Sequence, residues 1–557
     1  MEQNNDFNIN SSFILLPFMT EEEASDITRY DPVRGQVDLT KGFPEEKRLW
    51  NQDLHPTPIS RRNWGSLTFL AIWVGMAVQI PSWTMGSVGF FFGLDWLTTI
   101  VLMLAGNLVT LVPLLIQSHG GARYGIAEPQ LTRVRWGVYG AYFPSWLRAF
   151  VATGWWGIQS YILTEAAVGI FLVATGQTGV VLDAINHGSA SPLTLAQLFP
   201  QLFWTTFAIA VGAQIALLYF SPPSKSQPAL KWFIRIAAPL TFIGLVYIFS
   251  HFMGLTHWDF TPITQIPLKV EGHQHTIAVL AFLNANVGLW ITMALSMPDF
   301  TRFAKSQFAQ TIGQLPMPLI MIGIGVLGVL TTGATMVLFQ QPIWDPVLLA
   351  IVYIPELARI PVLLGIAGLT FSVNILANTI APAYDIANSY PRYLTWFRGV
   401  LITVAISLGL GAWTFYGDAY NFLFGWLLTY GALLGAVEGV IIFDYAIVRR
   451  FKFELPDVFM SKGKFRYWKG VNPAAVIAFI VTALILFIPY PGQDLVFANS
   501  WISSFLIGGT IYVILMAAWI IPKYQPHLKG NLATGYVSDS VKKMFEEKPE
   551  KKETTEN

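Results

Sequence analysis

The sequence predicts an all-α polytopic membrane protein. Of its 557 residues, 54% are hydrophobic and only 12% are charged, whereas soluble domains carry about 25% charged residues. Apolar runs of roughly 20 residues recur along the chain, which is the length that a helix needs to cross a bilayer. The net charge of +1 gives no reason to expect a nucleic-acid partner. The chain has no cysteine, which excludes thiolate metal sites, and no motif indicates a metal centre or an organic cofactor.

About twelve apolar runs are expected to form one spanning helix each. Their approximate bounds are 66–90, 94–116, 144–175, 198–220, 231–252, 277–298, 315–339, 357–384, 397–415, 420–448, 472–490 and 501–521. The chain then divides into an N-terminal tail, two groups of five spans, a final pair of spans and a C-terminal tail, at 1–63, 64–252, 253–450, 451–521 and 522–557. The first tail lacks an apolar core after a basic start, so it is not a signal peptide. The second tail is charged and expected to be disordered.

The orientation in the membrane follows from the Lys and Arg residues, which gather after the even-numbered spans. Examples are Arg123, Arg133, Arg135 and Arg148 between the second and third spans, and Arg449 and Arg450 after the tenth. Connections rich in Lys and Arg remain on the cytoplasmic side. Both tails are therefore expected to be cytoplasmic, in a plasma-membrane protein with an even number of spans.

Two spans are expected to be interrupted. Pro81 lies inside the first span, and because proline lacks an N–H and clashes with the preceding turn, the helix should open near 79–80. The sixth span carries Asn284, Asn286 and Gly288 in mid-membrane, which suggests a second break. Broken helices at corresponding positions of two halves indicate the binding site of a transporter. They correspond here if spans 1–5 and 6–10 form an inverted repeat.

Polar and aromatic side chains in the third and eighth spans are candidate ligand contacts. Trp155 and Gln159 are four residues apart and lie on the same helix face. The indole offers a stacking surface and the amide offers a donor and an acceptor, as a planar ring with N–H and C=O groups requires. Helix packing is the alternative explanation for both residues. Asn374 and Asn378 have the same spacing in the eighth span, and in an inverted repeat Gln159 faces Asn378 across the centre.

Several motifs in this order resemble those of the nucleobase–cation symporter-1 family, which includes bacterial hydantoin and allantoin transporters and fungal uracil and allantoin permeases. They are Asn51-Gln-Asp-Leu-His-Pro-Thr-Pro, Gln79-Ile-Pro81, Gly154-Trp-Trp-Gly-Ile-Gln159, Pro298-Asp-Phe-Thr-Arg302, Asn378-Thr-Ile-Ala-Pro382-Ala-Tyr-Asp385 and Asp444-Tyr445…Arg449-Arg450. The resemblance runs from about 51 to 450 and implies a LeuT-like fold, a five-plus-five inverted repeat with two extra helices.

The resemblance also implies roles for individual side chains. Trp155 and Trp290 are expected to sandwich the substrate ring, while Gln159 and Asn378 bond to its edge, with Gln79 nearby. One departure from the family is Leu289, which stands where related hydantoin carriers have glycine and is expected to reshape the pocket. A second is Ser372-Val373, where sodium-coupled members carry two adjacent hydroxyls.

The function expected from these observations is secondary active import of a small planar nitrogen heterocycle by alternating access, coupled to a cation. Uracil, hydantoin and allantoin all present an imide or ureide edge, so the residues do not distinguish among them. An amino-acid or amine carrier on the same fold is the alternative, and it requires a fixed charge beside Gln79 or Trp290, where the sequence has none. A sensor or an enzyme is disfavoured because no nucleophile elbow or phosphate loop is present.

The coupling ion is expected to be H⁺ or Na⁺. By analogy with this fold, the carbonyls of Gly75 and Val78 would hold sodium together with oxygens of the eighth span, but only Ser372 supplies a hydroxyl there. Glu165 and Glu438 lie within spans, and an acid in the hydrocarbon region suggests a proton or ion role. The balance favours a proton, with Glu165 as the better candidate because it shares a helix with Trp155 and Gln159. Pairing with a polar neighbour is the alternative for both acids.

Overall fold

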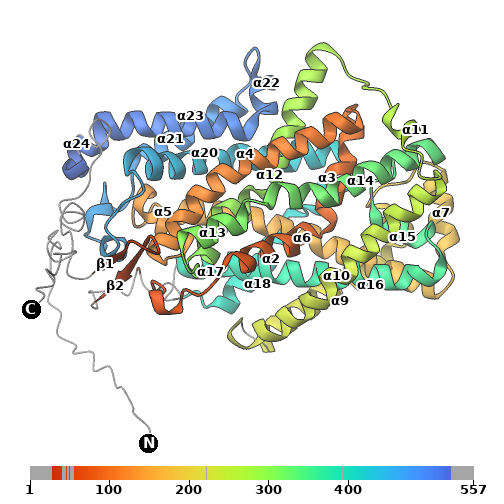
Figure 1. The fold of residues 1–557 in the computed structure, drawn as a ribbon, viewed down its shortest axis with the longest axis horizontal. Coiled ribbons are helices and arrows are strands. Elements are labelled where there is room, and N and C mark those ends of the chain that lie inside the picture. The colour runs from red at the N-terminus through yellow and green to blue at the C-terminus, as the bar shows by residue number, and fades with distance from the viewer. Residues whose placement is uncertain are drawn as a thin grey trace, which may run out of the picture.

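The computed structural model describes residues 28–40, 46, 49, 55–220, 223–389 and 393–528. Helices make up 77% of the structure, which confirms the predicted all-α membrane class. Figure 1 shows the long helices lying side by side in one elongated bundle. The prediction of a disordered C-terminal tail concerns residues that lie almost entirely outside the described part of the chain.

Within the described residues, nine helices or helix runs are long and apolar enough to cross a membrane. They are α4 (Trp96–Tyr124), α6 (Tyr142–Ala174), α9 (Pro200–Phe220), the later part of α10 (Pro223–Leu255), α12 (Gly272–Thr301), α13 with α14 (Gln307–Gln314, Met317–Phe339), α16 with η4 and α17 (Glu356–Val373, Asn374–Ile380, Ala381–Ser389), η5 with α20 and η6 (Asn421–Leu428, Thr429–Phe443, Asp444–Val448), and α23 with η9 and α24 (Ser500–Leu515, Met516–Ile520, Ile521–Tyr524). A bent pair, α2 (Ser66–Ala77) and α3 (Ile80–Val88), adds a tenth candidate.

Two further apolar helices, α18 (Trp396–Leu410) and α21 (Pro473–Phe487), have 15 residues each. At 1.5 Å per residue they are about 22 Å long, shorter than the hydrocarbon core of roughly 30 Å. The predicted number of twelve spans therefore stays a prediction, although each of the twelve predicted ranges overlaps one of these helices or helix runs.

Short elements cover the two ends of the bundle. At one end, called the α5 end, lie α5 (Glu128–Trp136) and an antiparallel hairpin of β1 (Thr28–Asp31) and β2 (Gln36–Leu39). The other end, called the α15 end, carries α7 (Thr178–Asn186), α11 (Thr261–Thr264) and α15 (Pro346–Val352) (Figure 1). The remaining short helices are η2 (Ile59–Arg61), η3 (Gly89–Phe92), α8 (Thr194–Leu198), α19 (Trp413–Tyr416), η7 (Pro456–Phe459), η8 (Lys464–Arg466), α22 (Gln493–Ala498) and η10 (Pro526–Leu528). The hairpin was not anticipated, because the N-terminal segment was treated only as a polar tail.

The predicted break in the first span is confirmed. Helix α2 and the run formed by α3 and η3 are bent by 61° relative to one another. Gln79 has an extended backbone with φ −148° and ψ 158°, and Pro81 lies in the first turn of α3. Proline has no N–H, and its ring clashes with the carbonyl four residues earlier, so a continuous helix cannot pass this point.

The predicted break in the sixth span is wrong, because α12 is continuous from Gly272 to Thr301. The side-chain amides of Asn284 and Asn286 donate to carbonyl oxygens four residues earlier in the same helix, at 2.9 and 2.8 Å. These bonds satisfy the amide donors without opening the backbone. Gly288 serves close packing instead, since a Cβ there would lie 3.0 Å from the carbonyl oxygen of Leu427.

Candidate substrate site

A cavity lies inside the bundle, where the break between α2 and α3 meets α6, α12 and the segment from α16 to α17. Its lining includes all six residues that were predicted to bind a substrate: Gln79, Trp155, Gln159, Leu289, Trp290 and Asn378. The fold thus brings together side chains from four separate parts of the chain. Their roles in binding stay predictions.

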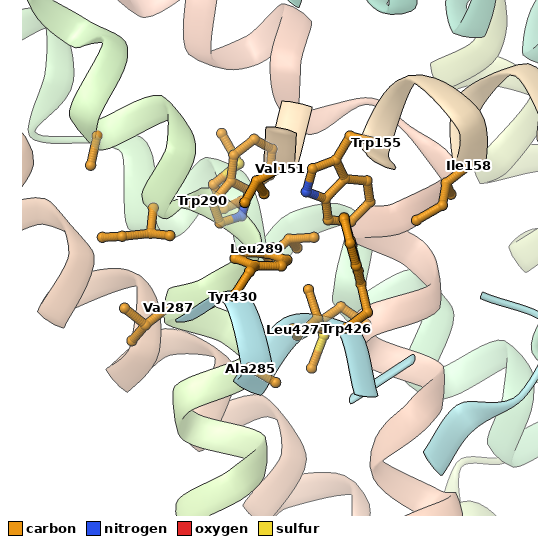
Figure 2. Packing of buried hydrophobic residues seen from close by; sticks show 14 of the residues in the cluster. Val151, Trp155, Ile158, Ala285, Val287, Leu289, Trp290, Trp426, Leu427 and Tyr430 are labelled. Carbon is orange, nitrogen blue, oxygen red and sulfur yellow. The ribbon is translucent and has the colours of Figure 1, made fainter. Parts of the chain in front are cut away.

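Two tryptophans form the aromatic part of the lining. Trp155 on α6 and Trp290 on α12 are 7% and 4% exposed, and Figure 2 shows both near Leu289 and Tyr430. The indole of Trp155 meets the ring of Trp426 edge-on, with centroids 6.3 Å apart. Each cavity indole is therefore held by a second aromatic ring, since Trp290 meets Trp73 in the same way at 6.4 Å.

The glycines around Trp155 explain why α6 can carry it into the centre of the bundle. A Cβ on Gly154 would lie 2.0 Å from the ring of Trp426, so only glycine leaves room for that ring against α6. A Cβ on Gly157 would lie 2.9 Å from the hydroxyl of Ser407 on α18. These two glycines permit close helix contacts and are not themselves part of the cavity lining.

The amide side chains of the lining are already hydrogen-bonded to one another or to their own helix. Nε2 of Gln159 donates to Oε1 of Gln79 at 3.1 Å, which links α6 to the break in the first span. Nδ2 of Asn378 donates to Oδ1 of Asn374 at 3.1 Å. A substrate edge that bonds to Gln159 and Asn378 would therefore have to exchange with these existing hydrogen bonds.

Asn374 supports the site from behind and does not line the cavity. It is fully buried, and its Nδ2 lies 3.0 to 3.2 Å from the Trp156 carbonyl, the Ser160 hydroxyl and the Gln214 side-chain oxygen. These contacts join η4 to α6 and α9. The geometry thus favours a helix-packing role for Asn374.

A local widening of the eighth span presents Asn378 to the cavity. Residues Asn374 to Ile380 form a π-helical turn between α16 and α17. Pro382 follows this turn, and it lacks the N–H that would bond to the carbonyl of Asn378 in a regular α-helix. Turns of this kind often occur at functional sites, because they loosen the backbone ladder where a side chain must reach inward.

A buried ion-pair network closes the cavity toward the α5 end. The guanidinium of Arg148 binds both carboxylate oxygens of Asp385, with Nε to Oδ2 at 3.1 Å, and it also reaches Asp299 at 3.3 Å. Its Nη1 donates to the hydroxyl of Ser296 at 2.6 Å. The prediction that Arg148 is a charge in a connection is wrong, because the residue lies in α6 and is 4% exposed. The sequence signal for this network was the pair of acids, Asp299 and Asp385, at the ends of two predicted spans, where a buried cation can face them.

The candidate cation ligands show two different local arrangements. In a continuous helix the amides of Gln79 and Ser82 would bond to the carbonyls of Gly75 and Val78. Here they donate to the carbonyls of Ala77 and Gln79 instead. The break therefore withdraws the usual helical donors from the carbonyls of Gly75 and Val78. In the eighth span, the hydroxyl of Ser372 donates to the Gly368 carbonyl of its own helix at 2.9 Å.

The two acids within spans lie away from the cavity lining. Glu165 is fully buried on α6, further toward the α15 end than Gln159, and its carboxyl group faces that of Asp345. Glu438 is fully buried on α20, and Trp501 of α23 lies beside it. The described residues contain no group of three or more His, Cys, Asp and Glu that could hold a metal ion.

Comparison with known proteins gives a consistent result. Residues 56–508 match the sequence model of a family described as permeases for cytosine/purines, uracil, thiamine and allantoin. The purine-uracil permease NCS1 of Arabidopsis thaliana is 31% identical over 84% of this chain and 78% of its own length. The allantoin permease of Bacillus subtilis is 29% identical over 86% of this chain and 95% of its own.

The fold also matches a solved structure. Mhp1, a nucleobase-cation-symport-1 family transporter solved in a closed conformation with bromovinylhydantoin bound, superposes with a TM-score of 0.67. The two chains are 23% identical, and the match covers 86% of this chain and 97% of Mhp1. The expected LeuT-like architecture is therefore confirmed as a fold.

The ion-pair network generates a stability prediction. Arg148→Gln removes the cation that faces Asp385 and Asp299, and breaking a buried pair from one side costs about 3–5 kcal/mol. We expect a large drop in the melting temperature of the detergent-purified protein. Arg148→Gln with Asp385→Asn should recover part of the loss, because fewer unpaired charges then remain buried. Arg398→Gln, on an exposed side chain, is the control. A double variant as unstable as the sum of both single changes would contradict this account.

Proposed function

Because the chain belongs to the family of permeases for cytosine/purines, uracil, thiamine and allantoin, we propose that this membrane transporter imports a small planar nitrogen heterocycle together with a cation. The observation that supports the substrate class most directly is the composition of the cavity. Two indoles and three side-chain amides converge on one enclosed space inside the bundle. The relatives named for purine, uracil and allantoin transport are consistent with such a ligand.

In the proposed complex the ring of the substrate stacks between Trp155 and Trp290. An aromatic sandwich accepts any flat ring, and the amides then select its edge pattern of N–H and C=O groups. Gln159 and Asn378 make these edge bonds, while Gln79 releases Gln159 or adds a bond of its own. Leu289 narrows the space beside Trp290 and sets the shape that the ring may have.

The charges of the cavity favour a neutral substrate over an amino acid or an amine. Among the described residues that line it, the charged side chains are Arg148 and Asp385, and these are paired with one another. A zwitterionic substrate needs separate partners for its carboxylate and its ammonium group. The paired charges supply neither, so we retain the heterocycle as the substrate class. The named relatives are permeases, which favours transport over catalysis.

The proposed orientation has the α5 end and both tails in the cytoplasm of a plasma-membrane protein. The connections at this end carry most of the Lys and Arg residues, as expected for the cytoplasmic side. Alternating access then means that the α15 end opens to admit the heterocycle and that the α5 end opens to release it. The network around Arg148 is the barrier that must part on the cytoplasmic side.

A proton is the proposed coupling ion. The released carbonyls of Gly75 and Val78 are suitable oxygens for sodium, but the hydroxyl of Ser372 is engaged within its own helix and Val373 has no side-chain oxygen. Sodium, as a hard cation, needs a fuller set of oxygen ligands. A buried acid such as Glu165 needs only one proton to change its charge.

The aromatic sandwich can be tested by alanine substitution. Stacking on an aromatic side chain is worth about 1–3 kcal/mol, so Trp155→Ala and Trp290→Ala should each weaken binding about ten-fold or more. Binding of labelled allantoin, hydantoin or uracil to purified, folded protein is the measurement. Trp519→Ala, on a side chain that is 38% exposed, is the control. If both cavity variants lose thermal stability but keep their affinity, the indoles only pack helices together.

The amide contacts predict that substitutions in the cavity impair uptake, whereas a substitution behind the cavity impairs stability. Gln159→Leu and Asn378→Leu leave substrate groups unpaired at a cost on the order of 1–3 kcal/mol each, and uptake at micromolar substrate should be lost. Asn374→Leu should lower the melting temperature instead, because it removes buried bonds between helices. Uptake of labelled substrate and thermal unfolding are compared for all three. Normal uptake by both cavity variants would move the site elsewhere.

The proposed proton coupling predicts how uptake depends on sodium and on the pH gradient. In vesicles that contain the protein, accumulation should persist when sodium is replaced by choline, and it should increase when the outer solution is made more acidic than the inner one. Counterflow without any gradient shows whether the protein is active. If accumulation requires sodium and ignores the pH gradient, proton coupling is wrong and Ser372 becomes a metal ligand.

A further inference from the structure

Two acidic side chains face each other at the α15 end, outside the cavity. Glu165 on α6 and Asp345 at the start of α15 are 0% and 1% exposed, and their carboxyl groups face each other. Within the described structure, no N–H or hydroxyl donor reaches Oδ2 of Asp345 or either carboxyl oxygen of Glu165, so each carboxyl group has the other as its available partner. Two carboxyl groups form a hydrogen bond only when one of them carries a proton.

The elements around the pair hold the two carboxyl groups close together. Oδ1 of Asp345 accepts from the amide of Val347 at 2.9 Å, so its other oxygen is free to face α6. One turn beyond Glu165, a Cβ on Gly169 would lie 2.8 Å from the side chain of Ile351 on α15. The glycine therefore lets α15 lie directly on the helix that carries Trp155 and Gln159.

The other titratable groups near the pair do not neutralise it. Tyr161 on α6 and Tyr416 on α19 are the groups that interact electrostatically with both acids. The hydroxyl of Tyr416 bonds to that of Thr84 on α3 at 2.9 Å. Three further helices pack against α15. Arg359 of α16 donates to backbone carbonyls at the C-terminal end of α15, away from Asp345. Asp183 and His187 of α7 are exposed, and His251 of α10 lies beside Tyr353.

We propose that Glu165 and Asp345 form a proton-binding site, in which a single shared proton holds α15 against α6 and closes the α15 end over the cavity. The proton comes from the outer solution and adds to one carboxylate oxygen of the pair, and no other bond forms or breaks. Loss of that proton leaves two buried carboxylates side by side, whose repulsion separates the helices. This inference rests on the proposed proton coupling and gives the proton a defined position.

The sign of the pH dependence follows from the geometry. Two separated, hydrated carboxyl groups lose their protons near pH 4. In the closed pair burial raises the pKa of Asp345 to about 6, and the shared proton is retained to a higher pH than in the open state. Proton binding therefore stabilises the closed state at low pH. This stabilisation is lost as the pH rises through the pKa at which the closed pair releases its shared proton.

The chain lacks cysteine, so a single introduced thiol can report whether α15 is seated. Ala350 is a buried residue of α15 itself, so Ala350→Cys reports its seating, whereas Ser189→Cys is exposed at the same end and reports the intrinsic pH dependence of the reagent. The ratio of their labelling rates by a membrane-impermeant thiol reagent should rise about five-fold or more between pH 5.5 and pH 8.5. Val347→Cys is a second buried position, should the first variant fail to fold.

Glu165→Gln is the decisive variant, because an amide keeps a hydrogen bond to Asp345 and cannot lose a proton. With it, the labelling ratio should stay low and independent of pH, whereas the matched buried-acid variant Glu438→Gln should keep the pH dependence. Counterflow of labelled allantoin, hydantoin or uracil should persist in Glu165→Gln, but the effect of outer pH on uptake should be lost.

The outcomes separate the proposals. Two results overturn the proton site. In one, the labelling ratio still depends on pH in Glu165→Gln. In the other, the labelling ratio does not change with pH when Glu165 is intact. If the unaltered carrier shows no counterflow of any of these heterocycles, the proposed substrate class fails, while the thiol labelling still decides whether the pair binds a proton.

Discussion

A helix in a lipid bilayer must pair every backbone N–H and C=O group, since lipid offers no partners. This constraint determines where the chain can open. The break between α2 and α3 exposes backbone groups, and it faces the protein interior beside α6 and α12, where the cavity lies. In α12 the side chains of Asn284 and Asn286 bond to carbonyls of their own helix, and that helix remains continuous.

The cavity lies between two groups of buried ionisable side chains that differ in how their charge depends on pH. Toward the α5 end, Arg148 neutralises Asp385 and Asp299, and a guanidinium keeps its charge at any physiological pH. Toward the α15 end, no cation of the described residues neutralises Glu165 or Asp345, and the net charge of the pair would change with one proton. In the proposed mechanism, the barrier at the α15 end responds to protons from the outer solution, whereas the barrier at the α5 end opens by rearrangement of the helices around the bound substrate.

The sequence was sufficient for the features that depend on local chemistry. Apolar length identified the spans, and Pro81 located the break, because a proline disrupts the helix whatever surrounds it. The same reasoning failed for α12, where asparagine and glycine do not break a helix when the amides bond back to carbonyls and the glycine packs against a neighbour. The six cavity residues were chosen correctly as neighbours, largely through the family resemblance.

Features that depend on distant partners could not be read from the sequence. Arg148 was taken for a loop charge because its partner Asp385 lies 237 positions along the chain. Asp345 lies in the connection between two predicted spans, where an acid is expected to be hydrated, and only the position of α15 on α6 buries it beside Glu165. Burial and charge pairing are properties of the packed helices, so a single sequence without its fold carries little information about them.

The central claim is that a planar heterocycle lies between Trp155 and Trp290 with its edge on Gln159 and Asn378. An experimental structure with the transported heterocycle bound tests this most directly. The account predicts a ring about 3.5–4 Å from both indole faces, with N–H and C=O groups within hydrogen-bond distance of the two amides. A substrate bound outside this cavity, or one that contacts neither indole face, would contradict it.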